Sequence, residues 1–204
     1  FHITMARQTA ISINTIPIGP LGIIGMPGCE ELTDKIDQYL VKWRKTQASE
    51  HAESIAFFGY QRDTYKIDVS IPRFGSGEGK GVINESVRGY DIYIVCDVFN
   101  YSCSYDMYGR KVYMSPDDHF ADLKRVISAL CSKPKRVSVI MPMLYEGRQH
   151  KRSSRESLDC AMALKELVHL GVENIITFDA HDQRVQNAIP DKSFENVMPT
   201  YQMI

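Results

Sequence analysis

The chain has 204 residues, of which 44% are hydrophobic and 24% are charged, and its formal net charge at pH 7 is -1. A chain of this length and composition can bury a hydrophobic core without disulfides, and its near-zero charge disfavours a nucleic-acid-binding surface as the main function. No apolar run approaches the roughly 20 residues needed to span a bilayer, and no secretory signal is visible. We therefore predict a cytoplasmic protein whose partners include neither membrane nor nucleic acid.

Residues 1–19 are interpreted as an N-terminal extension, and residues 20–204 as one domain. The chain contains five cysteines and no CxxC pair, which disfavours both structural zinc and a disulfide framework. Free thiols are typical of a reducing cytoplasm.

The first half of the domain begins with a short apolar strand over residues 21–25, which Pro27 and Gly28 end. An amphipathic helix is expected next, because apolar residues recur at spacings of four, four and three. These residues are Leu32, Ile36, Leu40 and Trp43. Residues 54–58 form a further apolar run, and residues 65–71 alternate like a strand up to Pro72.

The second half continues the alternation of strands and helices. Residues 91–96, 137–141 and 173–178 are predicted strands, and the first reads as covered on both faces. Ser115 and Pro116 predict a helix start, and residues 156–170 predict another helix that Gly171 ends. This order predicts an α/β fold with a mainly parallel sheet, whose ligands gather where strands end.

Three polar segments follow predicted strands. Residues 74–81 are rich in glycine but match neither a Walker A loop nor GxGxxG, so composition alone favours a flexible hairpin over a phosphate loop. Residues 148–155 are basic and suit either phosphate binding or a solvated surface. Asp179, His181 and Asp182 could bind a metal or transfer protons, although a lone histidine is more often structural. Together the segments predict an α/β protein that binds a phosphorylated ligand with a divalent metal.

The same segments resemble, in order, motifs of the ribose-phosphate pyrophosphokinase (PRPP synthetase) family. Residues 74–78 and 83–94 resemble F-x-N/D-x-E followed by I-x-E-S-V-R-G-x-D-V-Y-I. Residues 148–156 resemble R-Q-D-[KR]-K followed by R-[EA], and residues 175–181 resemble V-I-T-x-D-L-H. The likeness covers nearly the whole chain past Pro20.

This resemblance implies a three-layer domain of the phosphoribosyltransferase type, which is the N-terminal, ATP-side half of a homo-oligomeric synthetase. The implied reaction transfers pyrophosphate from Mg-ATP to C1 of ribose 5-phosphate, with Mg²⁺ as cofactor, and the ribose phosphate is bound mainly by a second half that this chain lacks. We expect the 204-residue chain alone to be inactive.

The resemblance also implies roles for individual residues. The ATP-binding residues would be Arg148, Gln149 and Lys151, together with Phe74, Ser76 and Glu78 from a neighbouring subunit. His181 would be catalytic and would contribute to the metal site with Asp179, and Ser86 with Arg88 would form an allosteric phosphate site.

Some positions depart from the family pattern. His150 replaces the usual Asp after Arg-Gln, Ser76 replaces Asn or Asp, and residues 60–73 and 100–115 are longer than expected. These departures leave a second interpretation open, a non-catalytic regulatory subunit that assembles with synthetases. A binding domain for another nucleotide is the third.

Overall fold

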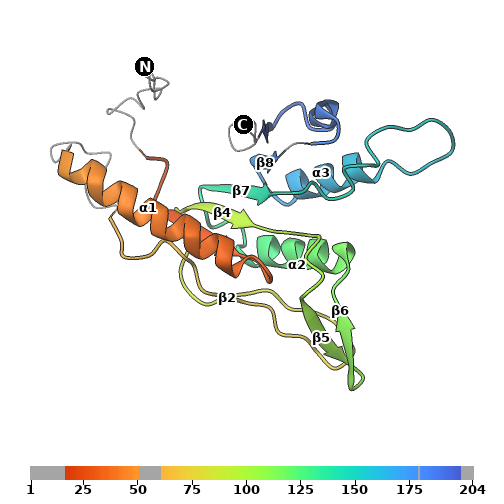
Figure 1. Ribbon diagram of the computed structural model, residues 1–204, viewed down its shortest axis with the longest axis horizontal. Coiled ribbons are helices and arrows are strands. Elements are labelled where there is room, and N and C mark those ends of the chain that lie inside the picture. Colours follow the sequence, from red (N-terminus) through yellow and green to blue (C-terminus); the bar gives the residue numbers. More distant parts are fainter. Residues whose placement is uncertain (1–16, 51–60, 179, 199–204) are drawn as a thin grey trace, which may run out of the picture.

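A five-stranded, entirely parallel sheet forms the centre of the computed structural model, which describes residues 17–50, 61–178 and 180–198 (Figure 1). Its strand order is β1-β4-β7-β8-β9. The strands are β1 (Leu21–Gly25), β4 (Asp91–Val95), β7 (Arg136–Met141), β8 (Asn174–Phe178) and β9 (Ser193–Val197). The predicted α/β class with a mainly parallel sheet is confirmed.

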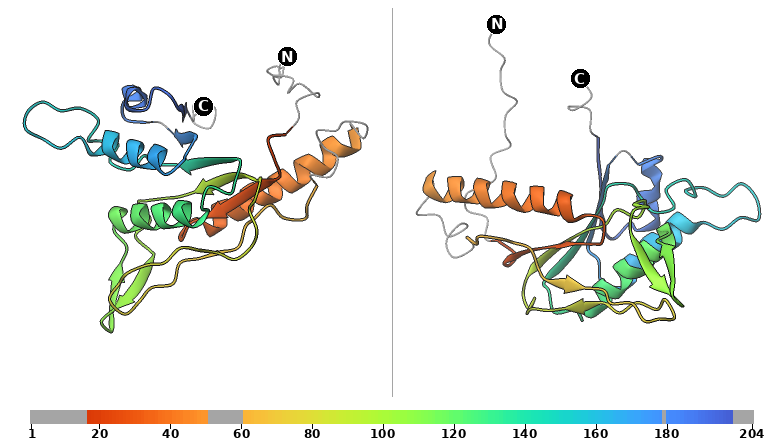
Figure 2. Two further views of the ribbon diagram at one scale, coloured as in Figure 1. Left: turned by 180° about the vertical axis from the view of Figure 1, so that it is seen from behind. Right: turned by 60° about the horizontal axis from the view of Figure 1, so that its bottom comes forward.

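Helices cover both faces of this sheet and give three layers (Figure 2). Helix α1 (Glu30–Glu50) lies on one face, where Ile36 and Leu40 pack against buried Ile23 and Val95. Helices α2 (Pro116–Ala129) and α3 (Asp159–His169) lie on the other face, together with the 3-10 helix η1 (Gln183–Ala188). No helix in the described residues is long and apolar enough to cross a membrane.

Strand β4 and helix α2 match their predictions because their signals are local. Ile92, Ile94 and Val95 of β4 have no exposed surface, as expected for a strand covered on both faces. The side chain of Ser115 accepts a hydrogen bond from the Asp118 backbone, and the Asp118 carboxylate accepts one from the Ser115 backbone. This capping box fixes the start of α2.

Helix α1 buries Ile36 and Leu40 of the predicted apolar stripe, but Leu32 departs from the prediction and two polar residues join the buried face. Leu32 is 41% exposed, whereas Thr33 and Asp37 are buried. Thr33 packs so closely on β1 that a Cβ added at Gly25 would lie 2.5 Å from its hydroxyl oxygen. The Asp37 carboxylate accepts hydrogen bonds from the Tyr65 amide at 2.7 Å and from the Thr64 hydroxyl at 2.8 Å. The hydrogen-bonded Asp37 carboxylate and Thr33, whose buried hydroxyl has no hydrogen-bond partner among the described residues, therefore occupy part of the buried face of α1.

The predicted strand at residues 65–71 is mostly irregular. The Ile23 amide donates to the Tyr65 carbonyl and the Ile67 amide to the Ile23 carbonyl, both at 2.8 Å, so this segment covers the edge of β1. Only β2 (Val69–Ser70) is a strand, and it pairs antiparallel with β3 (Val82–Ile83) outside the main sheet. The prediction that all three polar segments follow strands of one sheet is therefore wrong for residues 74–81.

Three further differences concern the start of one helix and two elements that were not predicted. Helix α3 begins at Asp159 rather than at residue 156, because the Glu156 carboxylate accepts hydrogen bonds from Ser153 and Ser154 and closes a loop turn. The hairpin of β5 (Ser104–Met107) and β6 (Arg110–Tyr113) was not predicted, and neither was β9. The apolar run at residues 54–58 lies outside the described residues.

Candidate functional site

The basic loop, defined as residues 148–155, meets the segment that follows β8. The rings of His150 and His181 lie edge to face, with centroids 5.0 Å apart and planes at 85°. Because β7 and β8 are parallel neighbours, the segments that follow them meet at the same edge of the sheet. The structure thus brings the basic loop, through His150, against His181, while no hydrogen bond, ion pair or ring contact of Arg148, Gln149 or Lys151 with His181 is present among the described residues.

Within this loop His150 is turned inward, whereas Arg148, Gln149 and Lys151 are exposed. The His150 side chain is 11% exposed, and its Nε2 lies 3.4 Å from Oδ2 of Asp182. Its Nδ1 is buried and has no hydrogen-bond partner among the described residues. A buried ring nitrogen without a partner is unfavourable unless a ligand or water satisfies it.

Asp182 anchors His150 as a carboxylate. The side chain of Asp182 caps η1 by accepting a hydrogen bond from the Arg184 amide at 2.9 Å, and the Arg184 guanidinium donates to both carboxylate oxygens. These hydrogen bonds from Arg184 hold the pKa of Asp182 well below its usual range. The Ala180 amide donates to Oδ1 of Asn196 at 2.8 Å and ties this segment to β9. Asp179 lies outside the described residues.

The segment before the basic loop is fixed on α2. The Tyr145 ring stacks on Phe120 with centroids 4.3 Å apart, and its hydroxyl donates to Asp117 at 2.6 Å. Burial, followed by this hydrogen bond to Asp117, raises the pKa of Tyr145. Burial and the nearby carboxylates of Asp159 and Asp117 raise the pKa of Glu146. Tyr145 belongs to no motif and was not predicted, but its contacts with α2 fix the chain just before the basic loop.

The glycine loop, defined as residues 73–80, forms a separate cluster. The Phe74 amide donates to the Glu78 carbonyl at 2.8 Å, which closes a tight hairpin. The Ser76 hydroxyl donates to the Glu78 carboxylate at 2.8 Å, and the Phe74 side chain is 56% exposed. The loop therefore presents one aromatic ring beside a hydroxyl–carboxylate pair.

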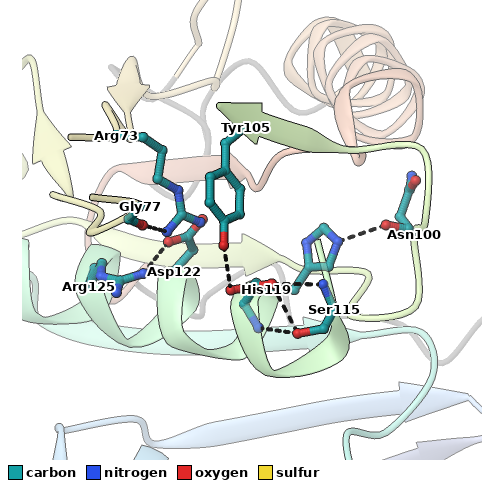
Figure 3. A network of polar contacts seen from close by, with 9 residues as sticks. Arg73, Gly77, Asn100, Tyr105, Ser115, His119, Asp122 and Arg125 are labelled. Carbon is teal, nitrogen blue, oxygen red and sulfur yellow. Dashed lines mark hydrogen bonds and ion pairs between the residues drawn. The ribbon is translucent and has the colours of Figure 1, made fainter. Parts of the chain in front are cut away.

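Helix α2 and the β5–β6 hairpin hold this loop from two sides (Figure 3). Arg73 donates to Asp122 at 2.6 Å and to the Gly77 carbonyl at 3.2 Å. Its guanidinium lies 4.4 Å from the centre of the Tyr105 ring. Arg125 also donates to Asp122, at 2.5 Å, and the Asp122 side chain is only 2% exposed. The hairpin suggested by composition is present, but it is held by buried charge pairs.

The glycine loop and the basic loop are two separate clusters in the described part of the chain. No hydrogen bond, ion pair or ring contact joins the glycine loop to the basic loop or to His181 in the described part of the chain. The glycine loop lies beside the β5–β6 hairpin at the lower end of the molecule, while the basic loop projects from the side near α3 (Figure 1).

The remaining predicted residues are on the surface. Ser86 and Arg88 are both exposed in the connection between β3 and β4. Among the described residues, which exclude Asp179, no group of three His, Cys, Asp or Glu side chains is arranged to hold a metal ion.

Comparison with known proteins identifies the family. A sequence model of the N-terminal domain of ribose phosphate pyrophosphokinase matches residues 21–171. The chain belongs to the ribose phosphate pyrophosphokinase family. The matched region contains the glycine loop, the basic loop and α3, but it ends before His181.

Individual members of the ribose phosphate pyrophosphokinase family are similar to this chain in sequence. Ribose-phosphate pyrophosphokinase 1 of Schizosaccharomyces pombe is 28% identical over 138 residues, which are 67% of this chain and 30% of that protein. The Vibrio parahaemolyticus enzyme is 26% identical over 136 residues, which are 65% of this chain and 38% of that protein. The chain thus spans well under half of these curated relatives.

A solved pyrophosphokinase structure supports the fold. The phosphoribosylpyrophosphate synthetase of Mycobacterium smegmatis superposes with a TM-score of 0.61 at 17% identity, over 90% of this chain and 50% of that one. At this identity the likeness concerns the fold alone, and it agrees with the α/β class described above.

Proposed function

We propose that this chain forms the ATP side of a ribose-phosphate diphosphokinase, which transfers the β,γ-pyrophosphoryl group of ATP to the C1 hydroxyl of ribose 5-phosphate. The observation that supports the proposal is the His150–His181 contact, which joins the loop that carries the exposed Arg148 and Gln149 to the segment after β8. The Arg148 guanidinium has no partner in the described part of the chain, so its donors are available to a ligand.

The residues suit pyrophosphoryl transfer because this chemistry needs positioning and charge neutralisation more than a covalent nucleophile. The C1 hydroxyl oxygen attacks the β-phosphorus, the bond between the β-phosphorus and the α,β-bridging oxygen breaks, and AMP leaves with that oxygen. The hydroxyl proton passes to solvent water. Arg148 can hold phosphate oxygens with a planar fork, and Lys151 adds a point charge. Gln149 supplies an uncharged donor and acceptor, and His181 meets the phosphates from the β8 side.

The residues near His181 fit a Mg²⁺ ion that takes most of its ligands from water and from the substrate phosphates. Mg²⁺ keeps several waters and substrate phosphate oxygens, and commonly takes one or two protein carboxylates. A site with few protein ligands near His181 is therefore compatible with this ion. We propose that Asp179 would supply the carboxylate and that His181 would lie beside the ion. When bound, the ion would neutralise charge on the phosphates.

The separation of the two clusters supports a homo-oligomer. No hydrogen bond, ion pair or ring contact joins Phe74, Ser76 or Glu78 to the basic loop within the described residues of one chain. We therefore propose that these three residues meet the adenine and ribose of a nucleotide bound by a neighbouring subunit. We further propose that ribose 5-phosphate is bound mainly outside this chain and that exposed Ser86 and Arg88 take a regulatory phosphate. Five free cysteines suit the reducing cytoplasm.

The test is separate titration of ATP and ribose 5-phosphate with the full-length protein. Each charge-assisted hydrogen bond contributes roughly 1.5–3 kcal/mol to the free energy of binding. Arg148→Ala should therefore raise the ATP requirement about tenfold or more. The ribose 5-phosphate requirement should change far less, and Arg148→Lys should recover only part of the loss. Lys42→Ala, which removes an exposed charge on α1, is the control.

Two outcomes would contradict the proposal in different ways. An unchanged ATP requirement in Arg148→Ala would mean that the basic loop is a solvated surface. ATP binding without turnover in the full-length protein would favour the regulatory-subunit interpretation.

A further inference from the structure

The β5–β6 hairpin turns through an unusual pair of residues. Its strands join at Tyr108 and Gly109, between the paired residues Met107 and Arg110. Both turn residues have positive φ, 48° for Tyr108 and 74° for Gly109. Two-residue turns of this kind strongly favour Asn or Asp followed by Gly, because bulky side chains are strained at positive φ. Tyrosine is therefore a poor choice for the turn itself.

Packing does not explain this residue either. The Tyr108 side chain is 80% exposed, more than any other large hydrophobic side chain in the described residues. It takes part in no ring stacking or cation–π contact within that part of the chain, unlike Tyr105 and Tyr113 of the same hairpin. An exposed aromatic ring held in a strained backbone conformation is typical of a functional contact.

The hairpin tip is docked on the glycine loop. The Tyr108 amide donates to the Gly75 carbonyl at 2.9 Å. Met107 packs so tightly on Gly77 that a Cβ there would lie 2.8 Å from its sulfur. Tyr108 therefore projects from a fixed point next to Phe74, whose ring is 56% exposed, and next to the Ser76–Glu78 pair.

We propose that Tyr108 is a second aromatic contact for the nucleobase that the glycine loop takes, so that the β5–β6 hairpin contributes to base recognition. Two exposed rings from separate elements can hold a planar heterocycle, and the hydroxyl–carboxylate pair of the same glycine loop can form hydrogen bonds with its edge. This inference rests on the proposed function, because it assumes that Phe74, Ser76 and Glu78 meet the nucleotide.

The experiment is calorimetric titration of the assembled full-length protein with Mg-ATP and with inorganic tripolyphosphate, which lacks the base. The Tyr108→Ala variant loses one stacking contact, so its affinity for ATP should fall about tenfold. Its affinity for tripolyphosphate should stay unchanged. Tyr108→Phe should bind ATP like the parent protein. Tyr113→Ala, which removes an exposed ring from the same hairpin away from the turn, should also leave both affinities unchanged.

Tyr108→Asn separates the role of the ring from the stability of the hairpin. Asn suits positive φ, so this variant should unfold at a higher temperature while losing ATP affinity as Tyr108→Ala does. Unchanged ATP affinity in both Tyr108→Ala and Tyr108→Asn, with a loss in Phe74→Ala, would overturn this inference alone. A parent protein without affinity for ATP would overturn the proposed function together with it.

Discussion

The glycine loop and the basic loop are held in place differently: the first has internal charge partners, whereas most charges of the second face solvent. The glycine loop is held by a nearly buried Asp122 that pairs with Arg73 and Arg125. The basic loop has exposed cations and is attached mainly through His150. Glycine content therefore did not mean flexibility, and the cations available to a ligand are those without internal partners.

Helix α2 links the two regions. Near its start Asp117 accepts the hydrogen bond from Tyr145, which precedes the basic loop. One turn further on, Asp122 holds the glycine loop through Arg73. A single well-capped helix thus contributes to the position of both loops. It holds the glycine loop directly, and it holds the basic loop through the residue Tyr145 that precedes it.

The largest effect should come from removing the buried carboxylate. Asp122→Ala leaves Arg73, whose side chain is 12% exposed, without its charge partner. Breaking one side of such a pair should lower the free energy of unfolding by roughly 3–5 kcal/mol, measured by urea denaturation. Asp106→Ala removes an exposed carboxylate from β5 and should change little. A loss below about 1 kcal/mol for Asp122→Ala would mean that the pair is no stronger than a surface one.

Limited proteolysis should separate the two loops directly. Trypsin should cleave after Lys151, Arg152 or Arg155 on the order of 100-fold faster than after Arg73, because cleavage requires local opening. Mass spectrometry of timed digests gives both initial rates. The difference should shrink in Asp122→Ala, and equal rates in the parent protein would contradict the contrast between the loops.

The smallest effect should follow from removing the His150 ring, which contacts the His181 ring. Aromatic ring pairs contribute about 0.5–1.5 kcal/mol, so His150→Ala should lower the turnover number roughly two- to tenfold and change the ATP requirement less. His150→Phe keeps a ring against His181 and should lose less activity. His169→Ala on the exposed side of α3 is the control. A pure change in the ATP requirement would mean that His150 contacts the nucleotide instead of positioning His181.

Much of the main sheet could be predicted because its signals are local. The continuous apolar run of β4 and the capping residues of α2 are readable within a few positions of the sequence. Strand β9 was missed because it alternates weakly at the sheet edge, and only Phe194 of its residues packs against the core. The β5–β6 turn was missed because Tyr108 stands where Asn would signal a hairpin.

The candidate site was predictable only in part. Parallel strand order correctly indicated that the basic loop meets the segment after β8. The inward position of His150 depends on Asp182, and the burial of Asp37 depends on Tyr65, 28 residues further along the chain. Such pairs are set by tertiary contacts that no local pattern reveals. The ligand roles of Phe74, Ser76, Glu78, Ser86 and Arg88 stay predictions.

The distribution of thiols makes the chain suitable for single-site labelling. All five cysteines are free, and only Cys131, in the turn after α2, is exposed. Burial raises the pKa of Cys29 and of Cys160 to about 11, and it also raises the pKa values of Cys96 and Cys103. These four are thus poor nucleophiles near neutral pH. A maleimide dye on Cys131 would place one fluorophore at the far end of the helix that supports both loops, without first removing any native cysteine.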